Sequence, residues 1–226
     1  MTDDPGPAAD DRPILLIATT NPGKLREIRG MLAGLPLQLR TLADLPAIEA
    51  PDETGSSFAE NARLKAEYYA SATGLPTVAE DSGLEIDALG GLPGVESARF
   101  GGAETTYPQK FALLYERLAM TPTPESPARF VCALAMVEAG RLLFDAVGTV
   151  EGHIAPEPRG SGGFGYDPIF FYPPFGSTLA EAGSRKDEVS HRAAAFAELR
   201  RYLLAQAAHM PGGVNRPSAA SQPPSA

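Results

Sequence analysis

The chain has 226 residues, 43% of them hydrophobic, which allows one large domain or two small ones with ample core. Its formal net charge of −9 argues against a nucleic-acid polymer as partner, because duplex binding requires many basic side chains to neutralise phosphates. No run approaches the roughly 20 apolar residues of a membrane span, no signal peptide opens the chain and only one cysteine is present, so we expect a cytoplasmic protein without a membrane partner or disulfides.

Both ends of the chain have compositions that cannot bury a core. Residues 1–12 form an acidic leader, and residues 210–226 are rich in Pro, Ser and Ala. We therefore expect disorder at both ends and a folded domain over residues 13–209.

Apolar patterning and capping residues define the expected elements in chain order. Asn21 and Pro22 suit the start of the first helix, and Ser57 with Glu60 forms a capping box that opens the second. Strands are expected at 14–18, 37–41, 76–80, 84–89, 130–138 and 142–150, and helices at 22–33, 57–73, 107–119 and 187–209.

The order of these elements indicates the fold class. Helices alternate with strands in the first half of the chain, and Ala139-Gly140 is expected to turn the last two strands into a hairpin. This order predicts an α/β fold with a mixed β-sheet flanked by helices.

An acidic stretch follows the third expected strand. Glu80 and Asp81 are adjacent carboxylates, and Ser82-Gly83 is expected to turn the chain into the next strand. Adjacent acids at the end of a buried strand repel each other and lose hydration, so they need a cation or a proton. A divalent metal held by oxygen ligands is one solution. A solvated acidic turn is the alternative.

The first expected strand leads directly into a helix through a polar segment. A helix N-terminus directs free backbone N–H groups and a positive dipole end at one point, which favours phosphate binding. Lys24 adds a cation where the helix dipole disfavours one, which suggests that an anion is expected there. An ordinary capped helix is the alternative. The segment consists of Thr19, Thr20, Asn21, Pro22, Gly23 and Lys24.

The second expected helix carries a polar pair. Asn61 and Lys65 are four residues apart and share a face, so both could meet the same anion as Lys24. Glu60 is expected to be used in the helix cap, whereas Glu53 precedes the helix and remains available as a metal ligand. A solvated helix face is the alternative.

Two further segments suit a purine base. Phe164 and Tyr166 stand on a glycine-rich frame, where aromatic rings can stack on a base or simply plug one end of a sheet. If Ser190 caps the last helix, His191 and Arg192 lie at its N-terminus, and Arg192 can donate two hydrogen bonds to a purine O6 and N7 edge. His191 alone is more often a surface or core histidine.

Five segments in this order resemble the inosine triphosphate pyrophosphatase family. They are TTNPGKLREI, DETGSSFAENARLKA, AEDSGLEIDALGGLPGVESARF, GGFGYDPIFF and SHRAAAFAEL, and together they extend over nearly all of the expected domain. The resemblance implies a long twisted mixed sheet, two lobes with a nucleotide cleft between them, and a homodimer. It also implies hydrolysis of ITP, dITP and XTP to the monophosphate and pyrophosphate with Mg²⁺.

The resemblance further implies roles for individual residues. Asp81 is expected to be the general base and a metal contact, and Glu53 is the second metal contact. Polyphosphate and sugar contacts are expected from residues 19–24, Lys65 and Ser82. The base pocket is expected to consist of Phe164, Gly165, Tyr166, Asp167, Lys186, His191 and Arg192.

Two other functions stay open at this point. One is a related pyrophosphatase that removes modified pyrimidine or methylated nucleotides. The other is a catalytically silent nucleotide-binding module.

Overall fold

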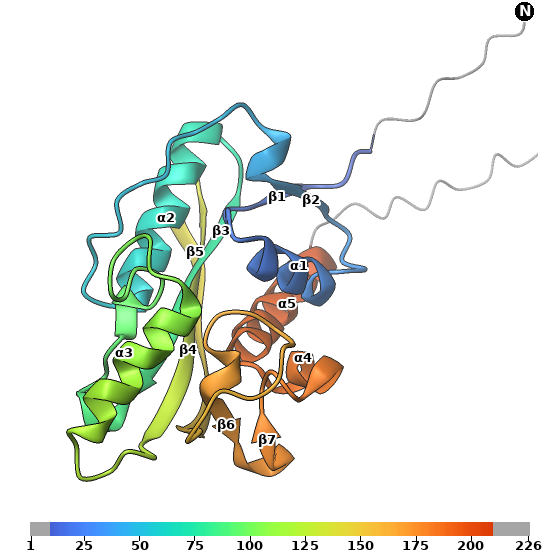
Figure 1. Cartoon of the computed structure of the whole chain (residues 1–226). Helices are drawn as coiled ribbons and strands as arrows, with labels where there is room; N and C mark the ends of the chain where they lie inside the picture. The colour runs from blue at the N-terminus through green and yellow to red at the C-terminus, as the bar shows by residue number, and fades with distance from the viewer. Residues whose placement is uncertain (1–9, 210–226) are drawn as a thin grey trace, which may run out of the picture.

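The computed structural model describes residues 10–209, and in this range the chain folds around a seven-stranded mixed β-sheet (Figure 1). The strand order is β2-β1-β3-β4-β5-β6-β7, with β1 parallel to β2 and β3 and every later pair antiparallel. The strands are β1 (Ile14–Ile17), β2 (Gln38–Thr41), β3 (Thr77–Ile86), β4 (Pro127–Glu138), β5 (Arg141–Ile154), β6 (Phe170–Tyr172) and β7 (Ser177–Thr178). The predicted α/β class is confirmed, whereas the disorder predicted for the ends falls outside the described residues except at 10–12.

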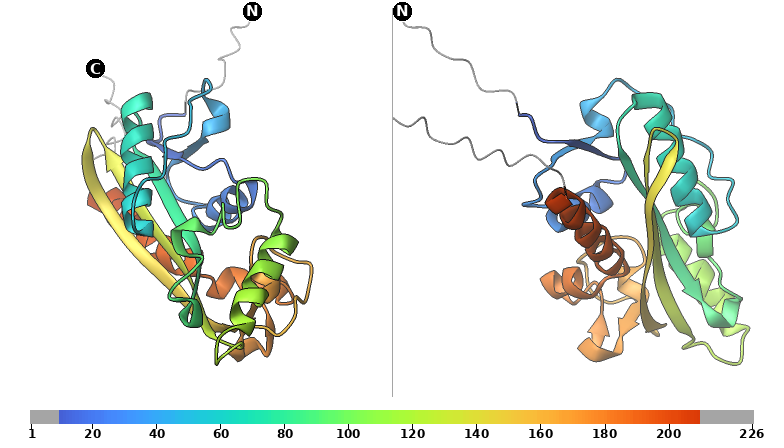
Figure 2. Two further views of the ribbon diagram at one scale, coloured as in Figure 1. Left: turned by 60° about the vertical axis from the view of Figure 1, so that its left-hand side comes forward. Right: turned by 180° about the vertical axis from the view of Figure 1, so that it is seen from behind.

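The helices cover both faces of the sheet. They are α1 (Pro22–Met31), α2 (Phe58–Thr73), α3 (Tyr107–Ala119), α4 (Lys186–Val189) and α5 (His191–His209). Figure 2 shows α2 and α5 on opposite faces of the long β4–β5 hairpin. None of the helices in residues 10–209 has both the length and the apolar character that crossing a membrane requires.

Strand β4 is buried on both faces, which explains its continuous apolar sequence. Cys132 and Leu134 pack in the cluster formed with α1 and α5, whereas Val131 and Ala133 pack in the cluster formed with α2. A third cluster joins α3 to β6 and to the end of β3. The cavity described below is lined by residues of the α2 cluster and of this third cluster.

The turn expected at Ser82-Gly83 is wrong, because β3 continues without interruption from Thr77 to Ile86 and pairs in regular register with β4. Gly83 serves a different purpose. A Cβ at this position would overlap Ser97 Oγ and lie 2.7 Å from the Gly94 carbonyl oxygen. The glycine therefore permits the close approach of residues 94–97, a contact that local sequence cannot reveal.

The last helix, expected as one element at 187–209, is instead divided into α4 and α5. Ser190 separates them with an extended backbone (ψ 153°), and its hydroxyl accepts from the Ala193 backbone N–H at 3.1 Å. The β4–β5 hairpin is confirmed and is longer than predicted. Its turn residues Ala139 and Gly140 both have positive φ, as a two-residue hairpin turn requires.

Candidate active site

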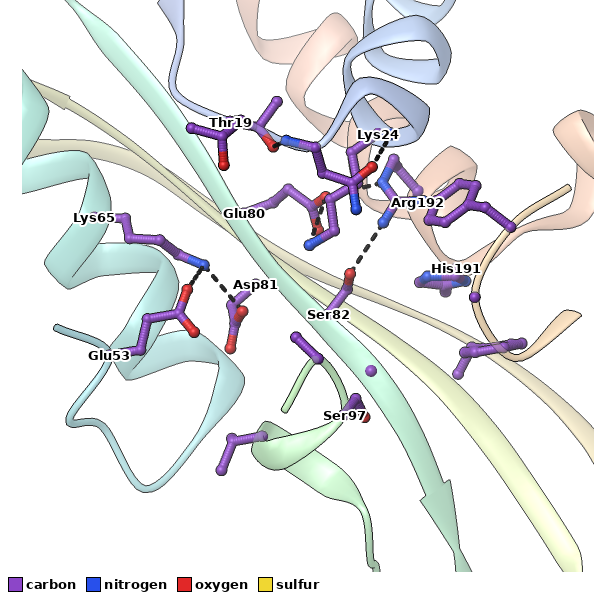
Figure 3. A pocket seen from close by; sticks show the side chains of 18 of the residues that line it. Thr19, Lys24, Glu53, Lys65, Glu80, Asp81, Ser82, Ser97, His191 and Arg192 are labelled. Carbon is purple, nitrogen blue, oxygen red and sulfur yellow. Dashed lines mark hydrogen bonds and ion pairs between the residues drawn. The ribbon is translucent and has the colours of Figure 1, made fainter. Parts of the chain in front are cut away.

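A cavity of about 310 Å³ opens where the start of α1, the middle of β3, α2, the loop before β6 and the start of α5 meet (Figure 3). All site residues expected from the sequence line it except Pro22 and Gly23. Pro22 begins α1, and Gly23 lies behind Phe164, since a Cβ on Gly23 would lie 2.9 Å from that ring. The structure thus gathers at one cavity residues that are up to 173 positions apart (19 to 192).

The start of α1 offers fewer free backbone donors than the sequence suggested. The Asn21 side chain accepts from the backbone N–H groups of Gly23 at 2.9 Å and Lys24 at 3.1 Å, and Pro22 has no N–H. The expected cradle of free N–H groups is therefore largely used by the cap itself. Side chains such as Thr19 and Lys24 become the principal donors at this end of the cavity.

Asp81 faces α2 and is held by two of its side chains. Lys65 Nζ lies 2.9 Å from Asp81 Oδ1 and 2.6 Å from Glu53 Oε1, so one ammonium joins the two carboxylates. Asn61 Nδ2 donates to Asp81 Oδ2 at 3.3 Å, and Asn61 Oδ1 accepts from the Gly55 backbone at 2.8 Å. Asn61 and Lys65 share a face as predicted, and the anion that they meet in the structure is Asp81.

The ion pair between Glu53 and Lys65 favours the charged form of both side chains. Burial alone would raise the pKa of Glu53, but the hydrogen bond and charge of Lys65 lower it below its ordinary value, with help from Lys24 and Arg99. Burial lowers the pKa of Lys65, but the charges of Asp81 and Glu53 outweigh it and raise that pKa. The result is a charged, preorganised group at the edge of the cavity.

Glu80 lies on the other face of β3, because successive side chains of a strand alternate. Its carboxylate meets Arg192 Nε at 3.0 Å and Lys24 Nζ at 3.3 Å, and Cys132 Sγ lies 3.2 Å away. Burial raises the pKa of Glu80, but the charges of Arg192 and Lys24 lower it well below its ordinary value. The two adjacent acids therefore each have cations of the protein itself and do not share one.

A buried ion network surrounds the start of α5. Arg192 Nη1 contacts Glu27 Oε2 at 2.7 Å and its Nη2 donates to Ser82 Oγ at 3.0 Å, in addition to the Nε contact with Glu80. Lys186 Nζ contacts Glu27 Oε1 at 3.0 Å and Asp167 Oδ2 at 2.7 Å. Because Arg192 uses three of its five N–H groups inside the protein, at most two remain for a ligand.

The loop before β6 wraps around the Asp167 carboxylate. Asp167 Oδ2 accepts from the Phe164 backbone at 2.8 Å, and a Cβ on Gly163 would overlap that oxygen. Burial raises the pKa of Asp167 although Lys186 acts against it. Lys186 Nζ lies 4.6 Å from the centre of the Phe164 ring, and both side chains line the same part of the cavity.

Tyr166 is part of the core, not a free ring for base stacking as the sequence suggested. It is 4% exposed, and its hydroxyl donates to the Ser97 carbonyl at 2.8 Å. Ser97 Oγ accepts in turn from the Leu84 backbone at 3.0 Å. This chain of contacts ties the loop before β6 to the middle of β3.

His191 is buried with its ring stacked on Phe130 at a centroid distance of 4.9 Å and an interplanar angle of 17°. Burial, with the nearby charge of Arg192, lowers the pKa of His191 well below its ordinary value. Its Nδ1 is buried and has no hydrogen-bond partner among the residues that the structure describes. His191 therefore lines the cavity as an imidazole that favours its neutral form, with Nδ1 shielded from solvent.

Sequence reasoning missed Glu27, Ser97 and Tyr107. Glu27 lies three residues after Lys24 on α1, so helical spacing could have placed it beside the site. Ser97 and Tyr107 carry no local signal, because their place at the cavity depends on contacts with distant segments.

The donors at the cavity fit Mg²⁺. This ion takes oxygen ligands and commonly binds through one or two carboxylates together with substrate phosphates. Glu53 and Asp81 supply two carboxylates bridged by Lys65, which is the charge pattern of such a partial site. Within residues 10–209 no group of three or more acidic, histidine or cysteine side chains forms a complete metal cage.

The fold and the cavity define an α/β protein with a carboxylate pair bridged by Lys65 at one end of a cavity and a buried ion network around Arg192 at the other. The model of the Ham1 family matches residues 15–202. The chain belongs to the Ham1 family, and the resemblance inferred from its motifs is confirmed.

Relatives and solved structures agree with this assignment. The chain is 46% identical to a protein of Dictyoglomus thermophilum named dITP/XTP pyrophosphatase, over 85% of this chain and 95% of that protein. It is 49% identical to a Thermus thermophilus protein of the same name, over 82% and 89%. A HAM1 protein structure from Coxiella burnetii aligns with TM-score 0.78 and 37% identity over 85% of this chain and 99% of that one.

Proposed function

We propose that this protein hydrolyses non-standard purine nucleoside triphosphates, namely dITP, XTP and ITP, to the monophosphate and pyrophosphate. The observation that carries the proposal is the division of one cavity into the Lys65-bridged pair Glu53 and Asp81 and the cluster around Arg192. The names of the relatives, dITP/XTP pyrophosphatase, point to the same substrates.

Asp81 is proposed as the general base. Lys65 and Asn61 hold its two oxygens from the α2 side, so the carboxylate has a fixed orientation toward the cavity. A carboxylate fixed in this way can accept the proton of an attacking water as the phosphoanhydride opens. Lys65 then stabilises the charge that builds up on the phosphate oxygens.

Lys24 and Thr19 are proposed to hold the polyphosphate. Lys24 extends from the first turn of α1 to Glu80 at 3.3 Å and is partly exposed to the cavity. A compact ammonium makes point contacts with phosphate oxygens, and an incoming phosphate can share it with Glu80. Mg²⁺ held by Glu53 and Asp81 would neutralise phosphate charge and polarise the bond that breaks.

His191, Arg192 and Lys186 are proposed to read the base. Their donors suit the 6-keto oxygen of hypoxanthine and xanthine, whereas the 6-amino group of adenine would face another donor. Buried donors left without acceptors discriminate strongly against the wrong substrate. The buried carboxylates of Glu27 and Glu80 keep Arg192 in one orientation for this purpose.

A homodimer, which rests on the family resemblance, and a cytoplasmic location, which rests on the composition of the sequence, are further parts of the proposal. Light scattering coupled to gel filtration gives the mass of the particle directly, and a monomer would contradict the first of them.

A nucleotide panel tests the proposed function. The protein is incubated with Mg²⁺ and ITP, dITP, XTP, ATP, GTP and modified pyrimidine triphosphates, and the products are identified. We expect monophosphate and pyrophosphate from the first three, with ATP poorly used. Preferred release from a modified pyrimidine would indicate the related pyrophosphatase, and no release from any substrate would indicate a silent binding module.

A further inference from the structure

Tyr107, the first residue of α3, lines the cavity at its base end but belongs to none of the motifs described above. A Cβ on Gly165 would lie 3.6 Å from the Tyr107 hydroxyl oxygen, which places that oxygen beside the loop of Phe164 and Tyr166. Burial raises the pKa of Tyr107, and Asp167 adds to the shift. The contact with Gly165 places the hydroxyl at the loop that also carries Asp167.

The ring of Tyr107 packs against neighbouring side chains. It meets the Tyr166 ring edge-on at a centroid distance of 5.3 Å and an angle of 89°, and it lies 6.2 Å from the Phe111 ring. Lys110 Nζ lies 4.9 Å from its ring centre. This packing restricts one side of the ring and leaves the rest accessible, and a tyrosine side chain has only two rotatable bonds before the hydroxyl.

The start of α3 is held in place by its own contacts. Thr106 and Gln109 form a capping box, in which Gln109 Oε1 accepts from the Thr106 backbone at 2.9 Å and from its hydroxyl at 2.8 Å. Lys110 is buried and donates to the carbonyls of Ala98 and Ser97, which anchors the helix to the cavity wall.

Tyr107 is 37% exposed, and its hydroxyl makes no hydrogen bond to another residue of the described range 10–209. The other two tyrosines of this region differ: Tyr166 donates to the Ser97 carbonyl and Tyr115 to the Ala155 carbonyl. An accessible hydroxyl at a cavity, which can both donate and accept and is not used by the protein, is available to meet a ligand.

We propose that Tyr107 is a specificity-determining contact, whose hydroxyl hydrogen-bonds to the purine ring of the bound nucleotide. This inference rests on the proposed function for the identity of the nucleotide. The base is the expected partner because the hydroxyl lies beside Gly165 in the loop expected to hold the base, whereas Lys65 of α2 contacts Glu53 and Asp81 instead.

The test compares Tyr107→Phe with Tyr115→Phe, which removes the same hydroxyl from the same helix outside the cavity. Dissociation constants are measured for dIMP, IMP and inorganic tripolyphosphate, and kcat/KM for dITP and ITP. We expect Tyr107→Phe to weaken dIMP and IMP binding and kcat/KM by about threefold to tenfold, the loss of one neutral hydrogen bond. Tripolyphosphate binding and the Tm should stay unchanged, and Tyr115→Phe should leave all binding constants unchanged.

Other outcomes would overturn the inference. Equal weakening of tripolyphosphate would mean a phosphate contact or a general disturbance, and loss for IMP but not dIMP would mean a contact with the ribose 2′-hydroxyl. Unchanged dIMP binding would mean no contact. The wild-type product assay reports separately on the proposed function, since dIMP binding can depend on Tyr107 even if no triphosphate is hydrolysed.

Discussion

The two ends of the cavity hold their charges in different ways. At the Asp81 end, the side chains of Lys65, Glu53 and Asp81 are 12%, 26% and 10% exposed. At the base end, those of Glu27, Lys186, Asp167, Arg192 and Glu80 are between 1% and 7% exposed. Partly hydrated ion pairs can exchange partners at low cost, whereas a buried pair leaves an uncompensated charge when one member is lost. The Asp81 end is thus the more accessible of the two to a substrate, and losing one charge there should cost less than at the more buried base end.

The largest effect on stability should come from removing one charge of the buried ion network at the base end of the cavity. Glu27→Gln removes the anion that joins Lys186 and Arg192. Loss of one member of a buried ion pair costs about 3–5 kcal/mol, so we expect the free energy of unfolding to fall by about that amount. Urea unfolding measures it. A change below about 1 kcal/mol would show that this network is no more sensitive to the loss of a charge than the Asp81 end.

Asp81→Asn tests the Asp81 end of the cavity through its effect on turnover. Asparagine keeps an oxygen for Lys65, and Lys65 keeps its pair with Glu53, so the fold should remain intact. Loss of a positioned general base should lower turnover at least about 10²-fold, or roughly 2.7 kcal/mol in the barrier. Pyrophosphate release measures turnover and circular dichroism checks the fold. Turnover near that of the wild type would remove Asp81 from this role.

The same contrast explains what could be foreseen from the sequence. The start of α2 and the whole of α3 follow from local capping and periodicity, and Asn61 with Lys65 follows from helical spacing. The predicted turn at Ser82-Gly83 was wrong because the glycine at position 83 is required by the close contact with Ser97, which lies 14 residues later on another segment. Glu27 meets Lys186 and Arg192, 159 and 165 residues away, and no local pattern contains such a pairing. The ion pairs of the base end were therefore harder to predict than those of the Asp81 end.

His191, at the base end of the cavity, should make the free energy of unfolding depend on pH. Its folded pKa lies well below the ordinary value, so below about pH 6.5 the unfolded chain takes up a proton that the folded protein does not. Stability should therefore fall with decreasing pH through this group, by at most about 1.4 kcal/mol per pH unit. Urea unfolding at pH 7.5, 6 and 5 measures the slope. His191→Gln should flatten it, and an equal slope in the variant would assign the dependence to other groups.

The smallest effect on stability should come from Glu53→Gln, which makes the same Glu-to-Gln change as Glu27→Gln but at the Asp81 end of the cavity. Glu53 shares Lys65 with Asp81 and has Arg99 Nη1 at 3.4 Å, so its loss leaves Lys65 paired and should cost less than about 1 kcal/mol of stability. If Glu53 contributes to a Mg²⁺ site, the Mg²⁺ concentration for half-maximal activity should rise about tenfold or more. Glu27→Gln is the control, because it should reduce stability without moving the Mg²⁺ titration. An unchanged titration in Glu53→Gln would make this glutamate only a partner of Lys65, and a large loss of stability would mean that the two ends of the cavity do not differ in their sensitivity to the loss of a charge.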